Sequence, residues 1–188
     1  MAWQRIFLFI VTAGLVLVTA FVARPTESAA DMFRFDAATL TDTALWTKVN
    51  NEPYRLGVQV DFLCAMPTAT SYEPYRKKNP HAASYITVYV NPIGRESMFA
   101  KEVQRFPEGS VIVKQKIGND VEGSKPLLYT IMRKRERGYN PAVGDWEFAV
   151  VGPNGTELQG IGKLEKCESC HKGKSDSDFI FRPYFKAE

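Results

Sequence analysis

The feature that most constrains this chain is a C-x-x-C-H motif near its end, which runs from Cys167 through Cys170 to His171. At this spacing two cysteine thiols reach the two vinyl groups on one edge of a porphyrin, and the next residue places an imidazole under the iron. The motif therefore predicts one covalently bound haem c per chain. Cys167 and Cys170 would form the thioether bonds, and His171 would be the axial ligand of the metal.

Three other kinds of site use a similar pair of cysteines. A structural zinc site needs further ligands, and the remaining candidates, Cys64 and His81, are well separated in the sequence. A thioredoxin-like redox pair begins a helix within a β-α-β unit, and this chain shows no such alternation of strands and helices. A structural disulfide stays open as an alternative, although it gives no reason for the adjacent histidine.

The N-terminal residues predict export from the cytoplasm. A short basic segment ending at Arg5 precedes an apolar run over residues 6–23, and small residues lead up to Ala30. This pattern is typical of a signal peptide over residues 1–30, with an uncleaved N-terminal membrane anchor as the alternative. Both place residues 31–188 in the periplasm or another extracytoplasmic compartment.

Charge and length limit the remaining choices. The chain has 24 basic and 21 acidic residues among 188, and this balance argues against a nucleic-acid partner. Residues 31–188 are enough for one domain with a buried core that needs no disulfide. Cys64 lies among apolar residues and is expected to be a buried free thiol.

Alternating apolar residues predict an antiparallel sheet in the second half of the chain. Ile86, Val88 and Val90 would share one face of a strand, as would Trp146 and Phe148 in a later one. The predicted strands cover residues 85–90, 110–116, 127–133, 145–151 and 156–163, with a hairpin turn at 153–155. The haem motif follows the last of these strands.

Helices are expected to be few and short. The apolar residues within residues 31–50 are irregularly spaced, which suggests one or two short helices, with Trp46 in the core. Residues 96–106 have apolar residues near helical spacing and predict a short amphipathic helix. The predicted fold class is therefore α+β, mainly β: an antiparallel sheet with a few helices and a C-terminal haem c site.

The sequence offers no obvious second axial ligand for the iron. No methionine follows His171, and Met66, Met98 and Met132 lie in segments where core packing explains a methionine equally well. His81 is the other imidazole of the chain and keeps a bis-histidine haem as an alternative. We expect an open distal face, which favours binding or chemistry of small molecules.

The chain resembles the cytochrome P-460 family, which includes the cytochromes c′-beta. Most of the likeness lies in the C-terminal half and follows the family's order. The runs that carry it are Phe106 to Lys114, Gly138 to Pro141, Gly144 to Phe148, Cys167 to His171 and Ser177 to Phe181, with weaker likeness around Trp46 and from Tyr85 to Asn91.

This resemblance implies a compact, mostly antiparallel fold, one covalent haem and commonly a homodimer. The family contains hydroxylamine-oxidising enzymes, whose haem has an additional bond from a lysine, and nitric-oxide-binding proteins that lack this bond. We therefore expect an exported monohaem cytochrome that binds or oxidises hydroxylamine or nitric oxide, with a periplasmic redox partner. A non-catalytic protein that binds nitric oxide or carbon monoxide and a simple electron-transfer cytochrome are the alternatives.

The resemblance points to Lys114 as a candidate for the lysine that bonds to the haem. It lies in a matching strand and would face a central pocket together with Ile112. Lys101 and Lys116 remain alternatives, and an outward-facing or ion-paired lysine is the simpler explanation for each of them.

Oxidation of hydroxylamine also needs a group that accepts protons. Glu147 is the first candidate, on the strand face opposite Trp146 and Phe148, and Asp145 and Glu136 are others. Each is more simply explained as a surface or turn carboxylate. Aromatic residues are the candidates for an apolar cap over the ligand: Tyr85, Tyr89, Phe99 and Phe106.

Overall fold

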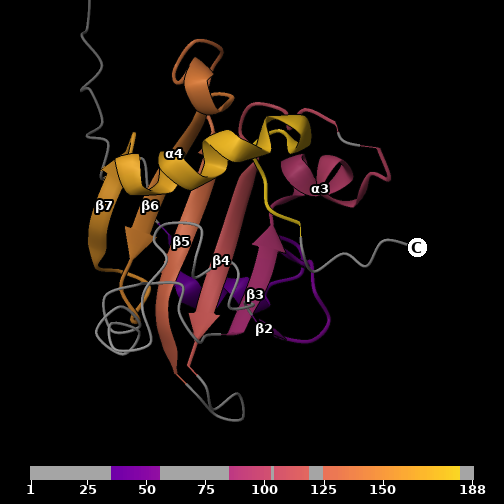
Figure 1. The fold of residues 1–188 in the computed structure, drawn as a ribbon. Helices are drawn as coiled ribbons and strands as arrows, with labels where there is room; N and C mark the ends of the chain where they lie inside the picture. The colour runs from indigo at the N-terminus through magenta and orange to yellow at the C-terminus, as the bar shows by residue number, and fades with distance from the viewer. Residues whose placement is uncertain (1–34, 56–84, 103, 119–124, 183–188) are drawn as a thin grey trace, which may run out of the picture.

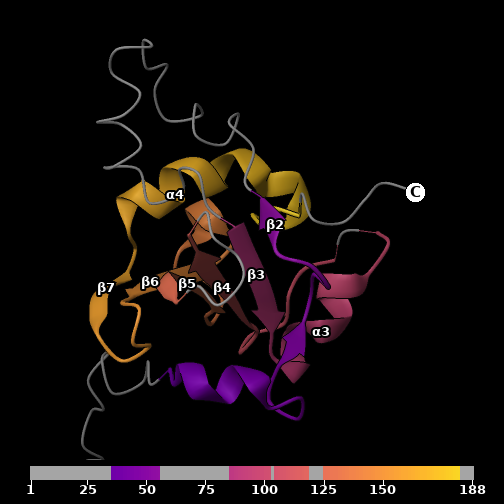
Figure 2. The same ribbon diagram turned by 90° about the horizontal axis from the view of Figure 1, so that it is seen from below.

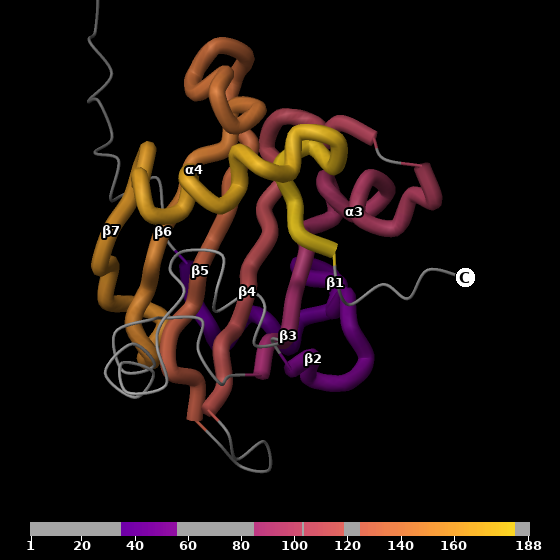
Figure 3. Tube along the Cα trace, in the orientation of Figure 1, coloured from indigo at the N-terminus to yellow at the C-terminus, as the bar shows by residue number. Residues whose placement is uncertain are grey.

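A twisted antiparallel sheet is the centre of the fold (Figure 1). The computed structural model describes residues 35–55, 85–102, 104–118 and 125–182. Within these residues the sheet has seven strands in the order β1-β3-β4-β5-β6-β7, and β2 also pairs with β3. The strands are β1 (Thr47–Lys48), β2 (Tyr54–Arg55), β3 (Tyr85–Val90), β4 (Val111–Ile117), β5 (Pro126–Lys134), β6 (Trp146–Val151) and β7 (Leu158–Gly162). Figure 3 shows β1 and β2 beside β3 at one edge and β7 at the other.

Short helices lie on both faces of this sheet. They are η2 (Ala37–Thr41), α3 (Pro92–Phe99), η3 (Pro141–Val143), α4 (Glu165–His171) and η4 (Lys172–Ser177). Seen along the sheet in Figure 2, α4 covers one face and the indigo helix η2 lies against the other. In the part of the chain described, no helix is long and apolar enough to cross a membrane.

The alternation of side chains along the strands creates two separate apolar clusters. On the face covered by α4, the first core cluster joins β3 to β6. Its buried members include Ile86, Val88, Val90, Ile112, Trp146, Phe148 and Ile180. The second core cluster, on the opposite face, includes Leu40, Val113, Tyr129, Ile131, Ala149 and Val151. Burying each large aliphatic or aromatic side chain contributes about 1.5–3 kcal/mol, so both faces stabilise the sheet.

The strands confirm the predicted fold class, α+β and mainly β. Ile86, Val88 and Val90 are each at most 1% exposed, and all five predicted strands occur, with ends that differ from the prediction by no more than two residues. The predicted hairpin at 153–155 also occurs between β6 and β7. Trp46 is only partly buried and packs against the second core cluster.

The helix predicted over residues 96–106 is wrong in position, because α3 begins earlier, at Pro92. Asn91 caps the helix by accepting a hydrogen bond from the amide of Gly94, and proline suits the first helical position. A Cβ at Gly94 would lie 2.9 Å from Val90, so this glycine lets α3 pack closely on the sheet. These capping signals outweigh the apolar spacing further along the chain.

Candidate haem-binding site

The C-x-x-C-H motif forms helix α4 across one end of the sheet (Figure 1). Positions 167, 170 and 171 are separated by three and four residues, so they lie on one side of an α-helix. This side is the half-buried one, whereas Lys166 and Ser169 are exposed. Cys167 packs against the first core cluster. The helix therefore presents the thiols and the imidazole together.

His171 is oriented by a hydrogen bond and by two aromatic rings. Its Nδ1 lies 2.6 Å from the backbone oxygen of Phe179. Because a carbonyl oxygen only accepts, Nδ1 carries the hydrogen and Nε2 is left as the ligand atom. The rings of Phe148 and Phe181 are each centred 5.1 Å from the imidazole. Burial lowers the pKa of His171 to about 4, despite that hydrogen bond, so the ring is neutral at pH 7.

Lys114 lies on the sheet face that carries the motif. In β4 it shares a face with Ile112, and its cross-strand neighbours are Val88 and Thr130. Burial lowers the pKa of its amine, while the two cysteines of the motif oppose this shift by electrostatic attraction. The amine also contributes to the lowered pKa of His171. The charge of Lys114 thus interacts with the cysteines and the histidine of the motif.

The two alternative lysines differ from Lys114 in position. Lys116 is two residues along the same face of β4 and is buried. Lys101 is exposed in the bend that follows α3. Lys114 interacts electrostatically with the cysteines of the motif.

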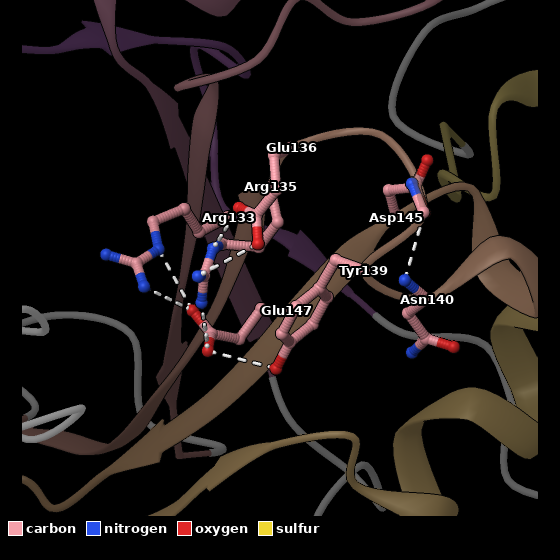
Figure 4. A network of polar contacts seen from close by, with 8 residues as sticks. Arg133, Arg135, Glu136, Tyr139, Asn140, Asp145 and Glu147 are labelled. Atoms are coloured by element: carbon pink, nitrogen blue, oxygen red, sulfur yellow. Dashed lines mark hydrogen bonds and ion pairs between the residues drawn. The ribbon is translucent and has the colours of Figure 1, made fainter.

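Glu147 lies on the other face of the sheet, and this corrects the expectation that it accepts protons at the haem. Its neighbour Phe148 faces His171, so the alternation along β6 turns the Glu147 carboxylate away. As Figure 4 shows, this carboxylate is held by Arg133, at 2.6 and 2.9 Å, and by Arg135, at 2.9 Å. Tyr139 donates a further hydrogen bond at 3.1 Å. A carboxylate with these partners joins β5 to β6 and stabilises the sheet.

The other two carboxylates proposed for that role also have structural partners. Asp145 accepts hydrogen bonds from the backbone amides of Gly138 and Asn140 and so shapes the loop before β6. Glu136 is exposed and paired with Arg135. Asn140 in turn donates to Glu168 of the haem motif at 2.8 Å, which ties this loop to α4.

The predicted apolar cap of four aromatic residues does not form as one group. Tyr85 and Tyr89 point to the face opposite α4, because they alternate with Ile86 and Val88. Phe99 is 43% exposed. Phe106 is buried in the first core cluster. The aromatic residues beside His171 are instead Phe148 and Phe181, a contact that alternation in the sequence did not reveal.

The candidate axial methionines have different surroundings. Met98 is fully buried in the first core cluster. Met132 pairs with Phe148 across the strands and packs against that cluster. Met66, His81, Cys64 and the segment 1–34 lie outside the described residues.

Sequence reasoning missed a buried ion pair behind the motif. The two carboxylate oxygens of Asp178 accept from the Lys134 amine at 2.9 and 2.7 Å, and these side chains are 4% and 7% exposed. Asp178 lies in the segment Ser177 to Phe181, which carries part of the family resemblance. The neighbouring residues gave no indication that its carboxylate pairs with a lysine in β5.

These surroundings fit a covalently attached haem. Two thiols share one side of a helix, an imidazole presents Nε2, and an apolar sheet face with Phe148 lies beside them. The described residues contain no cluster of three or more histidine, cysteine or acidic side chains able to hold a metal ion.

Comparison with known families identifies the chain. Its sequence matches the family Cytochrome P460 over residues 68–182, which is more than half of its length. No curated protein matches the chain. Proteins of this family are typically extracytoplasmic. From the extent of the match, the chain belongs to the cytochrome P460 family of haem c proteins.

Proposed function

We propose that the chain attaches one haem through Cys167 and Cys170, with Nε2 of His171 on the iron, and holds hydroxylamine or nitric oxide on the opposite iron face. The observation that carries this proposal is the 2.6 Å contact of His171 Nδ1 with the Phe179 oxygen. This hydrogen bond leaves Nε2 of His171 unprotonated and able to bind iron. His171 directly follows Cys170 and lies on the same side of the helix as both thiols. Each thiol adds across a vinyl group, sulfur to one carbon and hydrogen to the other, so attachment needs no oxidant.

The residues of the site then have separate tasks. When bound, the haem supplies an iron that coordinates a small nitrogen species and exchanges electrons with it. His171 holds the iron in the neutral form that its lowered pKa favours. Phe148 and Phe181 pack against the imidazole and restrict its orientation. Lys114 approaches from the sheet with an amine whose pKa burial lowers, and this favours its neutral, nucleophilic form.

Lys114 decides between oxidation and simple binding in this proposal. A bond from its nitrogen to a porphyrin carbon replaces one N–H and one C–H bond, which is a two-electron oxidation and needs an oxidant such as hydrogen peroxide. We expect the intact holoprotein to weigh two hydrogen atoms less than chain plus haem. Lys114→Met should restore the full mass, and Lys116→Met, on the same face of β4, should not. A full mass in the unaltered protein would favour the gas-binding alternative.

An open distal face can be tested with carbon monoxide. The reduced holoprotein should change its absorption spectrum when the gas is added, since the iron face opposite His171 is expected to lack a strong ligand. His81→Ala should leave the ferric spectrum unchanged. If the gas has no effect, and His81→Ala converts low-spin to high-spin iron, the electron-transfer alternative is correct.

The proposal includes a location and partners. Residues 1–30 would direct export, with a membrane anchor if they are not cleaved. A periplasmic redox partner would take the electrons that hydroxylamine loses, and a homodimer is expected from the family resemblance. N-terminal sequencing of the secreted protein would locate the cleavage site.

A further inference from the structure

The backbone that follows the haem motif adopts an unusual conformation. After η4, Asp178 and Phe179 have φ values of 48° and 65°, in the left-handed region that residues with a Cβ rarely occupy. Two such residues in succession persist only where surrounding contacts hold them. The second of these residues supplies the carbonyl oxygen that accepts from His171. The conformation of this turn therefore determines where that oxygen lies.

Asp178 makes most of the contacts that hold the turn. Its carboxylate accepts from the Lys134 amine and, at 2.8 Å, from the backbone amide of Phe106. Its own carbonyl oxygen accepts from Trp146 Nε1 at 2.8 Å. The Lys134 amine lies 4.8 Å from the centre of the Trp146 ring, so both partners come from one packed corner of the sheet.

The loop before β6 restricts the turn from the other side. Gly144 has a φ of 65°, and a Cβ on it would lie 2.6 Å from the Phe179 ring. The Phe179 ring thus packs against the backbone of Gly144, where no side chain would fit. The Phe179 amide donates to the backbone oxygen of Lys174 at 2.7 Å. With both flanks fixed, the Phe179 carbonyl has one direction in which to point.

We infer that Asp178 is a positioning residue for the proximal ligand: through its contacts with Lys134, Phe106 and Trp146 it holds the Phe179 carbonyl on His171 and so strengthens the bond from His171 to the iron. The inference rests on the proposed haem function. A hydrogen bond from Nδ1–H to an acceptor makes the imidazole a stronger donor to metal and stabilises ferric over ferrous iron. Asp178 touches neither the haem nor its ligand, and acts only through the carbonyl of the next residue.

The test is Asp178→Asn in the holoprotein, which keeps the shape of the side chain and removes its charge. Weakening the hydrogen bond should move the iron–histidine stretching band of the ferrous protein to lower wavenumber in resonance Raman spectra. The reduction potential should rise, and a tenfold loss of ferric preference corresponds to about 59 mV for a one-electron couple. The matched control is Glu147→Gln, which neutralises a carboxylate that is 3% exposed but lies on the opposite sheet face. It should move neither quantity.

If Asp178→Asn does not yield folded protein, the double variant Lys134→Met/Asp178→Asn replaces it, because removing both charges leaves no buried ion unpaired. The same shifts are expected there. A folded variant with the original band and potential overturns the inference, as does an equal shift in Glu147→Gln. Failure of the proposed function looks different: the unaltered ferrous protein would then show no iron–histidine band.

Discussion

Serine at both Cys167 and Cys170, introduced together with Lys114→Met, should abolish covalent attachment of haem. Without thiols no thioether can form, and the single bond from His171 to iron does not survive acid. In the unaltered protein the haem should stay with the chain during extraction with acidic acetone, and intact mass should equal chain plus haem, less any hydrogen lost to a Lys114 bond. In the variant that lacks both thiols and the Lys114 amine, the haem should pass into the solvent and the mass should be that of the chain alone.

The control for that experiment is Cys64→Ser, which removes the remaining cysteine of the chain. It should leave haem content and mass of the bound group unchanged. Each single variant, Cys167→Ser or Cys170→Ser, should keep one thioether and therefore retain haem with an altered absorption spectrum. Haem that remains after extraction on the variant without both thiols and the Lys114 amine would contradict attachment at the motif.

Lys134→Met should strongly destabilise the fold. It leaves the carboxylate of Asp178, which is 4% exposed, with a hydrogen bond from the Phe106 amide but no counter-charge. Removing one partner of a buried ion pair costs about 3–5 kcal/mol, which for a chain of this size lowers the unfolding midpoint by about 6–20 °C. Chemical and thermal denaturation of the holoprotein, followed by circular dichroism, measure this loss.

Two variants separate the ion pair from general effects on stability. Lys163→Met removes an exposed lysine and should change the free energy of unfolding by less than about 0.5 kcal/mol. Adding Asp178→Asn to Lys134→Met should recover much of the loss, because the uncompensated charge disappears. A Lys134→Met protein as stable as the Lys163→Met protein would contradict a structural role for the pair.

Local patterns in the sequence determined a large part of this protein. The spacing of Cys167, Cys170 and His171 identified the candidate haem-binding residues without knowledge of the fold, and the structure then showed that this spacing puts all three on one side of helix α4. The period of two in the strands gave their positions, and it assigned Lys114 and Ile112 to one face. It also assigned Glu147 to the face opposite Phe148.

Only the tertiary structure decided which face of the sheet is the site. Alternation separates two faces but does not say which one α4 covers, and that choice brought Lys114 to the motif and turned Glu147 towards Arg133. The backbone oxygen of Phe179, which accepts from His171, is placed by the left-handed turn at residues 178–179. Lys134 holds this turn by pairing with Asp178, 44 residues away in the sequence. Hydrogen bonds and ion pairs between distant segments depend on the tertiary arrangement of the chain, which a local pattern in the sequence does not predict.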